Sequence, residues 1–171
     1  MKFKATLFGI AAIVIAAPAS AAAPSDPQIA HVAYTAGNID MAAAKQALAR
    51  SHNKTIRSFA QEMVRDHEAV NVKALALVKK LKVTPEANPI SAGLQKDASA
   101  TLRRLSRLNG RSFDRAYIDN EIAYHNAVNG ALESTLIPSA RNGELKSLLE
   151  TGLTLFREHQ THAEHVGKAL K

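Results

Sequence analysis

The chain has 171 residues, no cysteine, and 22 lysine and arginine residues against 15 aspartate and glutamate residues, for a formal net charge of +7. The absence of cysteine excludes disulfides, thiol catalysis, zinc–thiolate sites and lipid attachment through cysteine. The positive charge favours weak association with anionic surfaces of the cell envelope. We expect no nucleic-acid binding, because stacking aromatic residues do not accompany the basic group formed by Arg103, Arg104, Arg107, Arg111 and Arg115.

Residues 1–21 have the pattern of a secretory signal peptide. Lys2 and Lys4 supply the positive start, an apolar stretch follows, and Ala19-Ser20-Ala21 matches the small-residue cleavage site. Cleavage after Ala21 would leave residues 22–171, which we predict to form one domain with a formal charge of +5 once Lys2 and Lys4 are gone. Pro18 disfavours the alternative of an uncleaved membrane anchor, so we expect a periplasmic or secreted protein with no stable membrane insertion.

From Pro27 onward, apolar residues recur with the i, i+3, i+4, i+7 spacing of amphipathic helices. The first helix is predicted to open at Ser25 or Asp26 and to run to about Ser51. After a tight turn, the second helix extends to about Lys82.

A proline-marked connection at 83–90 precedes a shorter predicted helix at about 90–108. A further helix is expected from near Ser112 to before Pro138, and the last one from about 142 to 170. Four long helices with one long connection between the second and third favour an all-α fold. The expected architecture is a ferritin-like up-down four-helix bundle with an additional crossover helix between helices two and three.

Three histidines lie on helical stripes that are otherwise almost entirely apolar. His67 shares a stripe with Phe59, Met63, Val70 and Leu77. The stripe of His125 contains Ile118, Ile122, Leu132 and Leu136. The stripe of His159 contains Leu149, Phe156, Ala163 and Val166. Because such stripes face the core, each imidazole should point into the bundle. Asp40 lies on the inner face of the first helix, and Glu121 precedes His125 by one helical turn.

Imidazoles and carboxylates that face one another inside a bundle are the ligands that transition metals prefer. The candidate metal ligands are Asp40, His67, Glu121, His125 and His159, and the candidate ions are iron, manganese, zinc and copper. The alternative interpretation is that these histidines are satisfied by neighbouring groups and only fix the helix register. No catalytic residue and no organic cofactor is predicted, because phosphate-binding loops and nucleophile motifs are absent from the sequence.

Other carboxylates and histidines are expected at the helix edges. Asp66 should pair with Arg65 or with a basic group of another helix. A surface metal clamp formed by His162 with Glu158 or His165 is a further alternative. Glu62 is the remaining carboxylate considered as a metal ligand. A di-iron oxidase is disfavoured, because no Glu-x-x-His motif occurs in the chain.

The chain resembles the bacterial domain-of-unknown-function family 4142 over residues 27–170. The resemblance rests on Gly37-Asn38-Ile39-Asp40-Met41, on the run from Ile56 to His67, on Phe113-Asp114-Arg115-Ala116-Tyr117 with His125, and on the run from Leu153 to His159. The chain departs from the family pattern at Asp40, where glutamate is favoured, and at Thr154, where proline is common. The resemblance implies an exported ferritin-like protein in which His67, His125 and His159 are the family-like histidines, and it implies no reaction.

These observations predict an exported helical-bundle protein of the cell envelope, non-catalytic and with a role in stress tolerance. A metal-binding protein with a site inside the bundle is the first alternative, and a di-iron oxidase is the second. The sequence specifies no protein partner.

Overall fold

The computed structural model describes residues 23–170, and all regular structure in this range is helical. The predicted signal peptide, residues 1–21, lies outside the described residues. The elements are α1 (Asp26–Arg50), α2 (Lys54–Leu81), α3 (Pro89–Leu105), α4 (Gly110–Ala131), the π-helical segment η1 (Leu132–Leu136), α5 (Ile137–Ser139) and α6 (Gly143–Ala169). The predicted all-α fold is therefore confirmed.

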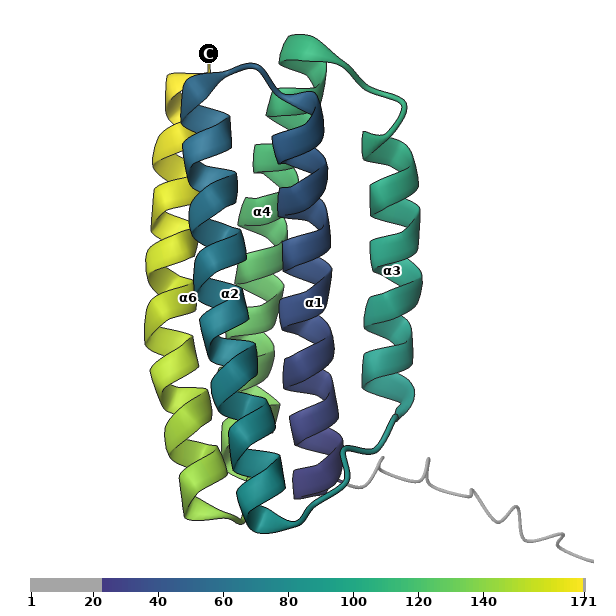
Figure 1. The fold of residues 1–171 in the computed structure, drawn as a ribbon, viewed down its shortest axis with the longest axis vertical. Coiled ribbons are helices and arrows are strands. Elements are labelled where there is room, and N and C mark those ends of the chain that lie inside the picture. Colours follow the sequence, from purple (N-terminus) through teal and green to yellow (C-terminus); the bar gives the residue numbers. More distant parts are fainter. Residues whose placement is uncertain (1–22, 171) are drawn as a thin grey trace, which may run out of the picture.

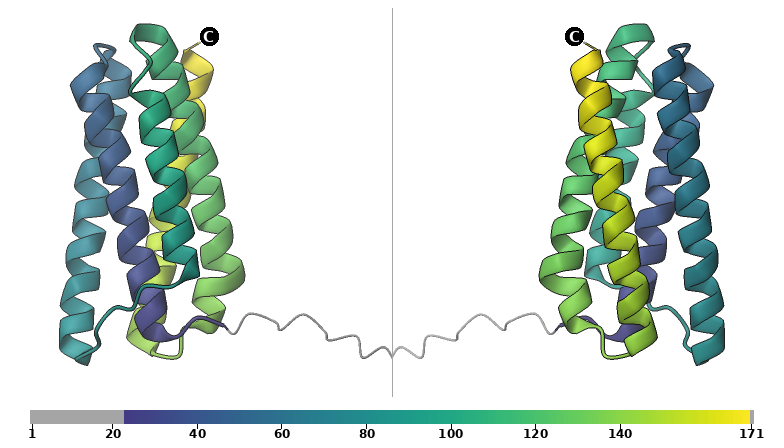
Figure 2. Two further views of the ribbon diagram at one scale, coloured as in Figure 1. Left: turned by 90° about the vertical axis from the view of Figure 1, so that its right-hand side faces the viewer. Right: turned by 90° about the vertical axis from the view of Figure 1, so that its left-hand side faces the viewer.

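The four long helices α1, α2, α4 and α6 lie side by side, and α3 packs on the outside against α1 and α4 (Figures 1 and 2). The short turn after α1 makes α2 antiparallel to it, whereas α3 returns the chain to the other end of the bundle before α4 begins (Figure 1). As a result α2 and α4 run in the same direction. One crossover of this kind is the connection found in ferritin-like bundles, and the ferritin-like assignment itself stays a prediction.

Side-chain caps fix the beginnings of three long helices. Ser25 forms a capping box with Gln28 at the start of α1, where Pro27 occupies the first turn. Asn53 and Asn142 accept hydrogen bonds from the first-turn backbone N–H groups of α2 and α6. Each cap satisfies donors that the helix itself cannot pair, so these boundaries follow from the local sequence and agree with the predicted ones.

Three predicted boundaries are wrong. Pro89 belongs to α3 rather than to the connection, because the first turn tolerates proline and Asn88 caps the helix. Ser112 is not an N-cap: α4 begins at Gly110, whose φ of 53° allows the sharp entry from the preceding turn. Helical structure also continues through Pro138, because the π turn of η1 restarts the helix just before it and places the proline in a new first turn.

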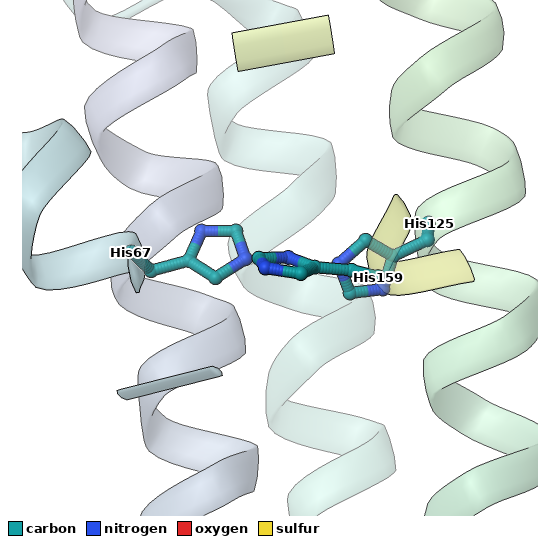
Figure 3. A group of neighbouring side chains, drawn as sticks. All are labelled: His67, His125 and His159. Atoms are coloured by element: carbon teal, nitrogen blue, oxygen red, sulfur yellow. The ribbon is translucent and has the colours of Figure 1, made fainter. Parts of the chain in front are cut away.

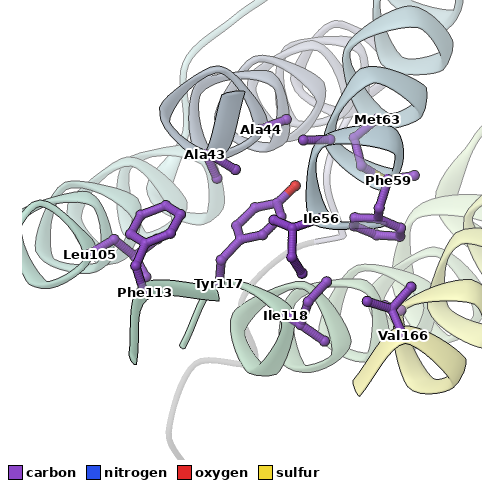
Figure 4. Close-up of a cluster of buried hydrophobic side chains, with 13 residues drawn as sticks. Ala43, Ala44, Ile56, Phe59, Met63, Leu105, Phe113, Tyr117, Ile118 and Val166 are labelled. Atoms are coloured by element: carbon purple, nitrogen blue, oxygen red, sulfur yellow. The ribbon is translucent and has the colours of Figure 1, made fainter. Parts of the chain in front are cut away.

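The hydrophobic core has two parts, one toward each end of the bundle. The first, centred on Phe59, Phe113 and Tyr117, contains the large side chains drawn in Figure 4. The second is built mainly from aliphatic residues: Ile29, Val32, Leu132, Leu136, Leu145, Leu149 and Leu153.

Each long helix contributes to both parts of the core, and between its two contributions it carries a polar residue. In α2 the first core takes Ile56 to Val64 and the second takes Leu77, with His67 between them. Asp40 separates the two parts in the same way in α1, and His159 does so in α6. The fold therefore buries one polar layer between two apolar blocks.

Among the described residues, no helix is both long enough and apolar enough to span a bilayer.

Candidate metal centre

The polar layer brings together one or more side chains from each of the four long helices. Asp40 comes from α1, His67 from α2, Glu121 and His125 from α4, and His159 from α6, and each is at most 3% exposed. Figure 3 shows the three imidazoles converging on a common region at one level of the bundle. The centroids of their rings lie 5.4 to 5.8 Å apart. The structure therefore confirms that the three imidazoles point into the bundle, as the helical stripes predict.

The Asp40 carboxylate lies between two of the imidazoles. Its Oδ2 atom is 3.3 Å from Nε2 of His67 and 3.4 Å from Nε2 of His125. Neither contact has the geometry of a hydrogen bond, and both carboxylate oxygens are buried without a hydrogen-bond partner. The three ligand atoms are therefore close together without satisfying one another.

The other ring nitrogens of His125 and His159 are held in place by neighbouring groups. Nδ1 of His125 lies 3.0 Å from the backbone oxygen of Glu121, one turn earlier in α4. Nε2 of His159 lies 3.1 Å from Oδ2 of Asp66. Each contact leaves the remaining nitrogen of its ring, Nε2 of His125 and Nδ1 of His159, buried and without a hydrogen-bond partner.

His67 differs from the other two histidines, because neither of its ring nitrogens has a hydrogen-bond partner among the described residues. The ring is held by packing instead: Phe156 of α6 stacks on it with a centroid distance of 4.7 Å and an interplanar angle of 11°. A neutral imidazole positioned in this way has one ring nitrogen free to accept a hydrogen bond or bind an ion and one N–H group free to donate.

The electrostatics of the layer favour the neutral imidazoles of His125 and His159. Burial lowers the pKa of His125 to about 4, and burial also lowers the pKa of His159 despite the opposing effect of its hydrogen bond to Asp66. For Asp40, burial alone would raise the pKa, but the surrounding imidazoles, His67 first, outweigh it and the pKa is lowered. The layer thus favours an ionised carboxylate at Asp40 and deprotonated imidazoles at His125 and His159, the forms that bind metal ions.

Glu121 behaves differently from Asp40. Burial raises its pKa well above the ordinary value, and the nearby Asp40 carboxylate adds to the effect. Burial and the Asp40 charge therefore favour the protonated form of the carboxyl group, which lies at the edge of the layer with Oε2 3.9 Å from Nδ1 of His125. Asp40, Glu121 and His125 nevertheless form one of the three groups of close potential ligands in the described residues; the other two are His67 with His125 and His159, and Glu62 with Asp66 and His159.

Asp66 is the residue that sequence reasoning placed only at the helix edge. The structure confirms its pairing with Arg65 and identifies the basic group of another helix as His159. The hydrogen bond from Arg65 and then that from His159 lower the pKa of Asp66. The signal in the sequence is weak, because Asp66 is adjacent to a core position but on a different helical stripe.

The surface clamp predicted for His162 has a different arrangement. Nδ1 of His162 lies 3.0 Å from Oε2 of Glu62 on α2, so the side chain pairs across the α2–α6 seam. Glu158 and His165 are exposed and belong to none of the groups of potential ligands in the described part of the chain.

The low pKa of His125 predicts a pH-dependent stability. The unfolded chain protonates this histidine near pH 6.5 and the folded protein only near pH 4, so between these values the unfolded state binds more protons. The free energy of unfolding should therefore decrease as the pH falls from 6.5 to 4, by up to about 3 kcal/mol from this residue alone.

Denaturant unfolding at several pH values, for the wild type and for His125→Gln, measures this contribution as the difference between the two proteins. Because Glu121 is present in both, its own titration cancels to first order. If the free energy of unfolding changes with pH in the same way for the two proteins between pH 4 and pH 6.5, the pKa of His125 is not lowered by folding.

Comparison with known proteins agrees with the helical fold. No curated protein matches the chain. The chain is similar to a crystal structure described as that of a "putative secreted protein DUF305" from Streptomyces coelicolor, with a TM-score of 0.62 and 10% sequence identity. The match covers 84% of this chain and 87% of the other, and at this identity it supports the fold alone.

A family model for a domain of unknown function, DUF4142, matches residues 14–166. This range contains every residue of the polar layer, together with the motifs on which the resemblance rests. The chain belongs to the DUF4142 family.

Proposed function

We propose that this protein is an exported, non-catalytic metal-binding protein that holds one divalent transition-metal ion in the polar layer. Asp40, His67, His125 and His159 are the ligands, and Glu121 supports the site from its edge. The observation that carries the proposal is the set of buried nitrogen and oxygen atoms that face one another without hydrogen-bond partners.

The distances from Asp40 to two of the histidines fit a tetrahedral ion. Ligand atoms 2.0–2.1 Å from a tetrahedral Zn²⁺ lie about 3.4 Å from one another. The distances from Asp40 Oδ2 to Nε2 of His67 and to Nε2 of His125 are 3.3 and 3.4 Å. An ion at this position would satisfy atoms that otherwise remain buried at a penalty of about 1–3 kcal/mol each.

The hydrogen bonds around the layer also support a metal site. A histidine that binds a metal generally directs its other ring nitrogen to a carboxylate or a backbone carbonyl, which fixes the ring. His159 has this arrangement with Asp66, and His125 has it with the Glu121 backbone oxygen. Histidines that only stabilise a core usually have hydrogen-bond partners, whereas here several buried ring nitrogens and carboxylate oxygens lack them.

The donor set favours zinc or copper among the candidate ions. Imidazole nitrogens suit Zn²⁺ and Cu²⁺, whereas Mn²⁺ prefers sites dominated by oxygen ligands. A di-iron centre of the ferritin type requires a glutamate or a Glu-x-x-His pair from every helix. Here the layer holds two carboxyl groups, Asp40 and Glu121, and burial disfavours the ionised form of Glu121, so the di-iron oxidase has little support.

Export is supported by the signal-peptide pattern of residues 1–21. We infer that cleavage after Ala21 releases residues 22–171 as one folded domain, located in the periplasm or outside the cell. A role in stress tolerance would follow if the bound ion is stored or withheld at the envelope.

Native mass spectrometry of the full-length protein expressed with its own N-terminus tests both parts of this proposal. The exported fraction should have the mass of residues 22–171, and after exposure to Zn²⁺ or Cu²⁺ it should carry one ion per chain. A His67→Leu/His125→Leu/His159→Leu variant should carry none, whereas the matched control His165→Leu, which changes an exposed histidine of α6, should bind as the wild type does.

The outcomes separate the two parts. A mass that includes residues 1–21 would contradict export without affecting the metal site. Equal ion binding by the triple variant and the wild type, or no binding by either, would contradict the metal site and leave the histidines as structural residues.

A further inference from the structure

An apolar cavity of about 140 Å³ adjoins the polar layer. It lies within the second part of the core, on the side of the layer toward the start of α1, and α1, α2, α4 and α6 all line it. Leu94 and Ile90 of α3 cover one side. An apolar cavity of roughly 150 Å³ can stay free of water and bind a molecule the size of benzene.

Two features of the sequence create this space. The first is the small size of its lining residues at positions that could otherwise hold core side chains, which include Ala30, Ala33, Ala36, Ala74, Ala131 and Gly152. The second is η1, whose π turn changes the helical register just where Leu132 and Leu136 line the cavity. Single π turns of this kind occur frequently at functional sites.

The polar residues that line the cavity are few. Tyr124 donates its hydroxyl to the Ala36 backbone oxygen at 2.9 Å, and Asn71 donates to Asn38 Oδ1 at 3.1 Å, so both are engaged. His67 and His125 line the end next to the polar layer. Nδ1 of His125 is in hydrogen-bond contact with the backbone oxygen of Glu121. His67 is only 3% exposed, and its Nδ1 atom has no hydrogen-bond partner among the described residues.

We propose that this cavity binds a small, uncharged, mainly apolar molecule with one hydroxyl group, for which phenol is the simplest probe, and that the hydroxyl pairs with Nδ1 of His67. The apolar body would fill the space between the small residues, where it meets aliphatic side chains and Phe156. The hydroxyl would supply the partner that the outer nitrogen of His67 lacks, as Asp66 does for His159.

The lining excludes charged ligands. Moving a carboxylate or an ammonium group from water into an apolar cavity is strongly unfavourable unless a charged partner pairs with it. No lysine, arginine, aspartate or glutamate is among the residues that line the cavity, so such a partner is missing there. A hydroxyl needs only one neutral donor or acceptor, which His67 provides.

Calorimetric titration of the metal-free full chain with phenol, toluene and benzoate tests the proposal. Phenol should bind about fivefold more tightly than toluene, which has the same shape without the hydroxyl, and benzoate should not bind measurably. His67→Leu should bind both neutral probes and lose the preference for phenol. The proposal is independent of the metal site, because every titration is made without metal.

Ala33→Leu, which places a larger side chain in the cavity, should weaken phenol binding by about tenfold or more. The matched control Ala49→Leu, at an exposed position of the same helix, should bind as the wild type does. If Ala33→Leu does not fold, Ala74→Leu fills the same cavity from α2. Phenol binding that is unaffected by filling the cavity, or that is no tighter than toluene binding, would overturn the proposal.

Discussion

Addition of Zn²⁺ to the metal-free protein should raise its free energy of unfolding by about 4 kcal/mol when the free ion is a thousandfold above its dissociation constant. The reason is that the folded state alone assembles Asp40, His67, His125 and His159 at one level of the bundle. The measurement is thermal and denaturant unfolding at fixed ion concentrations. The stabilisation should increase with the logarithm of the ion concentration.

The variant Asp40→Leu/His67→Leu should abolish this response without harming the metal-free protein. Replacing a buried polar pair by apolar residues of similar volume is often neutral or stabilising, by about 1–4 kcal/mol, because the desolvation penalty disappears. Changing both residues together avoids leaving the Asp40 carboxylate with a single partner. His165→Leu is the control for a histidine replaced outside the layer.

Two results would contradict this prediction. A zinc response that survives in the double variant would place the ion elsewhere, for example at Glu62, Asp66 and His159. A double variant that is several kcal/mol less stable than the wild type, with no zinc response in either protein, would show that the layer serves to fix the helix register.

Phe59→Ala should have the opposite pair of effects, a large loss of stability with an unchanged zinc affinity. Phe59 is fully buried in the first part of the core, where its ring packs edge-on against the rings of Tyr117 and His162. The distances between ring centroids are 6.1 Å to Tyr117 and 5.1 Å to His162. Removing a buried phenylalanine side chain leaves a cavity and costs about 3–5 kcal/mol. Because Phe59 lies two turns from His67 in α2, about 12 Å along the helix, the ligands should keep their positions.

Denaturant unfolding of the metal-free proteins measures the loss of stability, and zinc titration under conditions where both proteins are folded measures the affinity. Val72→Ala, which shortens a side chain that is 61% exposed in the same helix, is the control and should change the stability by less than about 0.5 kcal/mol. A comparable fall in zinc affinity for Phe59→Ala would mean that the first part of the core and the polar layer are energetically coupled.

The sequence by itself determined the helices and the burial of the three histidines. The caps at Ser25, Asn53 and Asn142 and the apolar stripes are local signals, because they depend only on residues within a few helical turns. The position of His67 between Met63 and Val70 in the repeat was therefore enough to predict that its imidazole points inward. Local signals were weaker at α4, where the π turn and Gly110 shifted the expected ends.

Only the tertiary structure decided which polar atoms meet and which remain free. The contacts of Asp66 with His159 and of Glu62 with His162 join α2 to α6 across about a hundred residues of sequence, and a shift of one residue in either helix would remove them. The cavity beside His67 likewise arises from small residues on separate helices. Helical periodicity fixes the direction of a side chain about its own axis, whereas the relative height and rotation of neighbouring helices depend on packing, and these set the distances at the site.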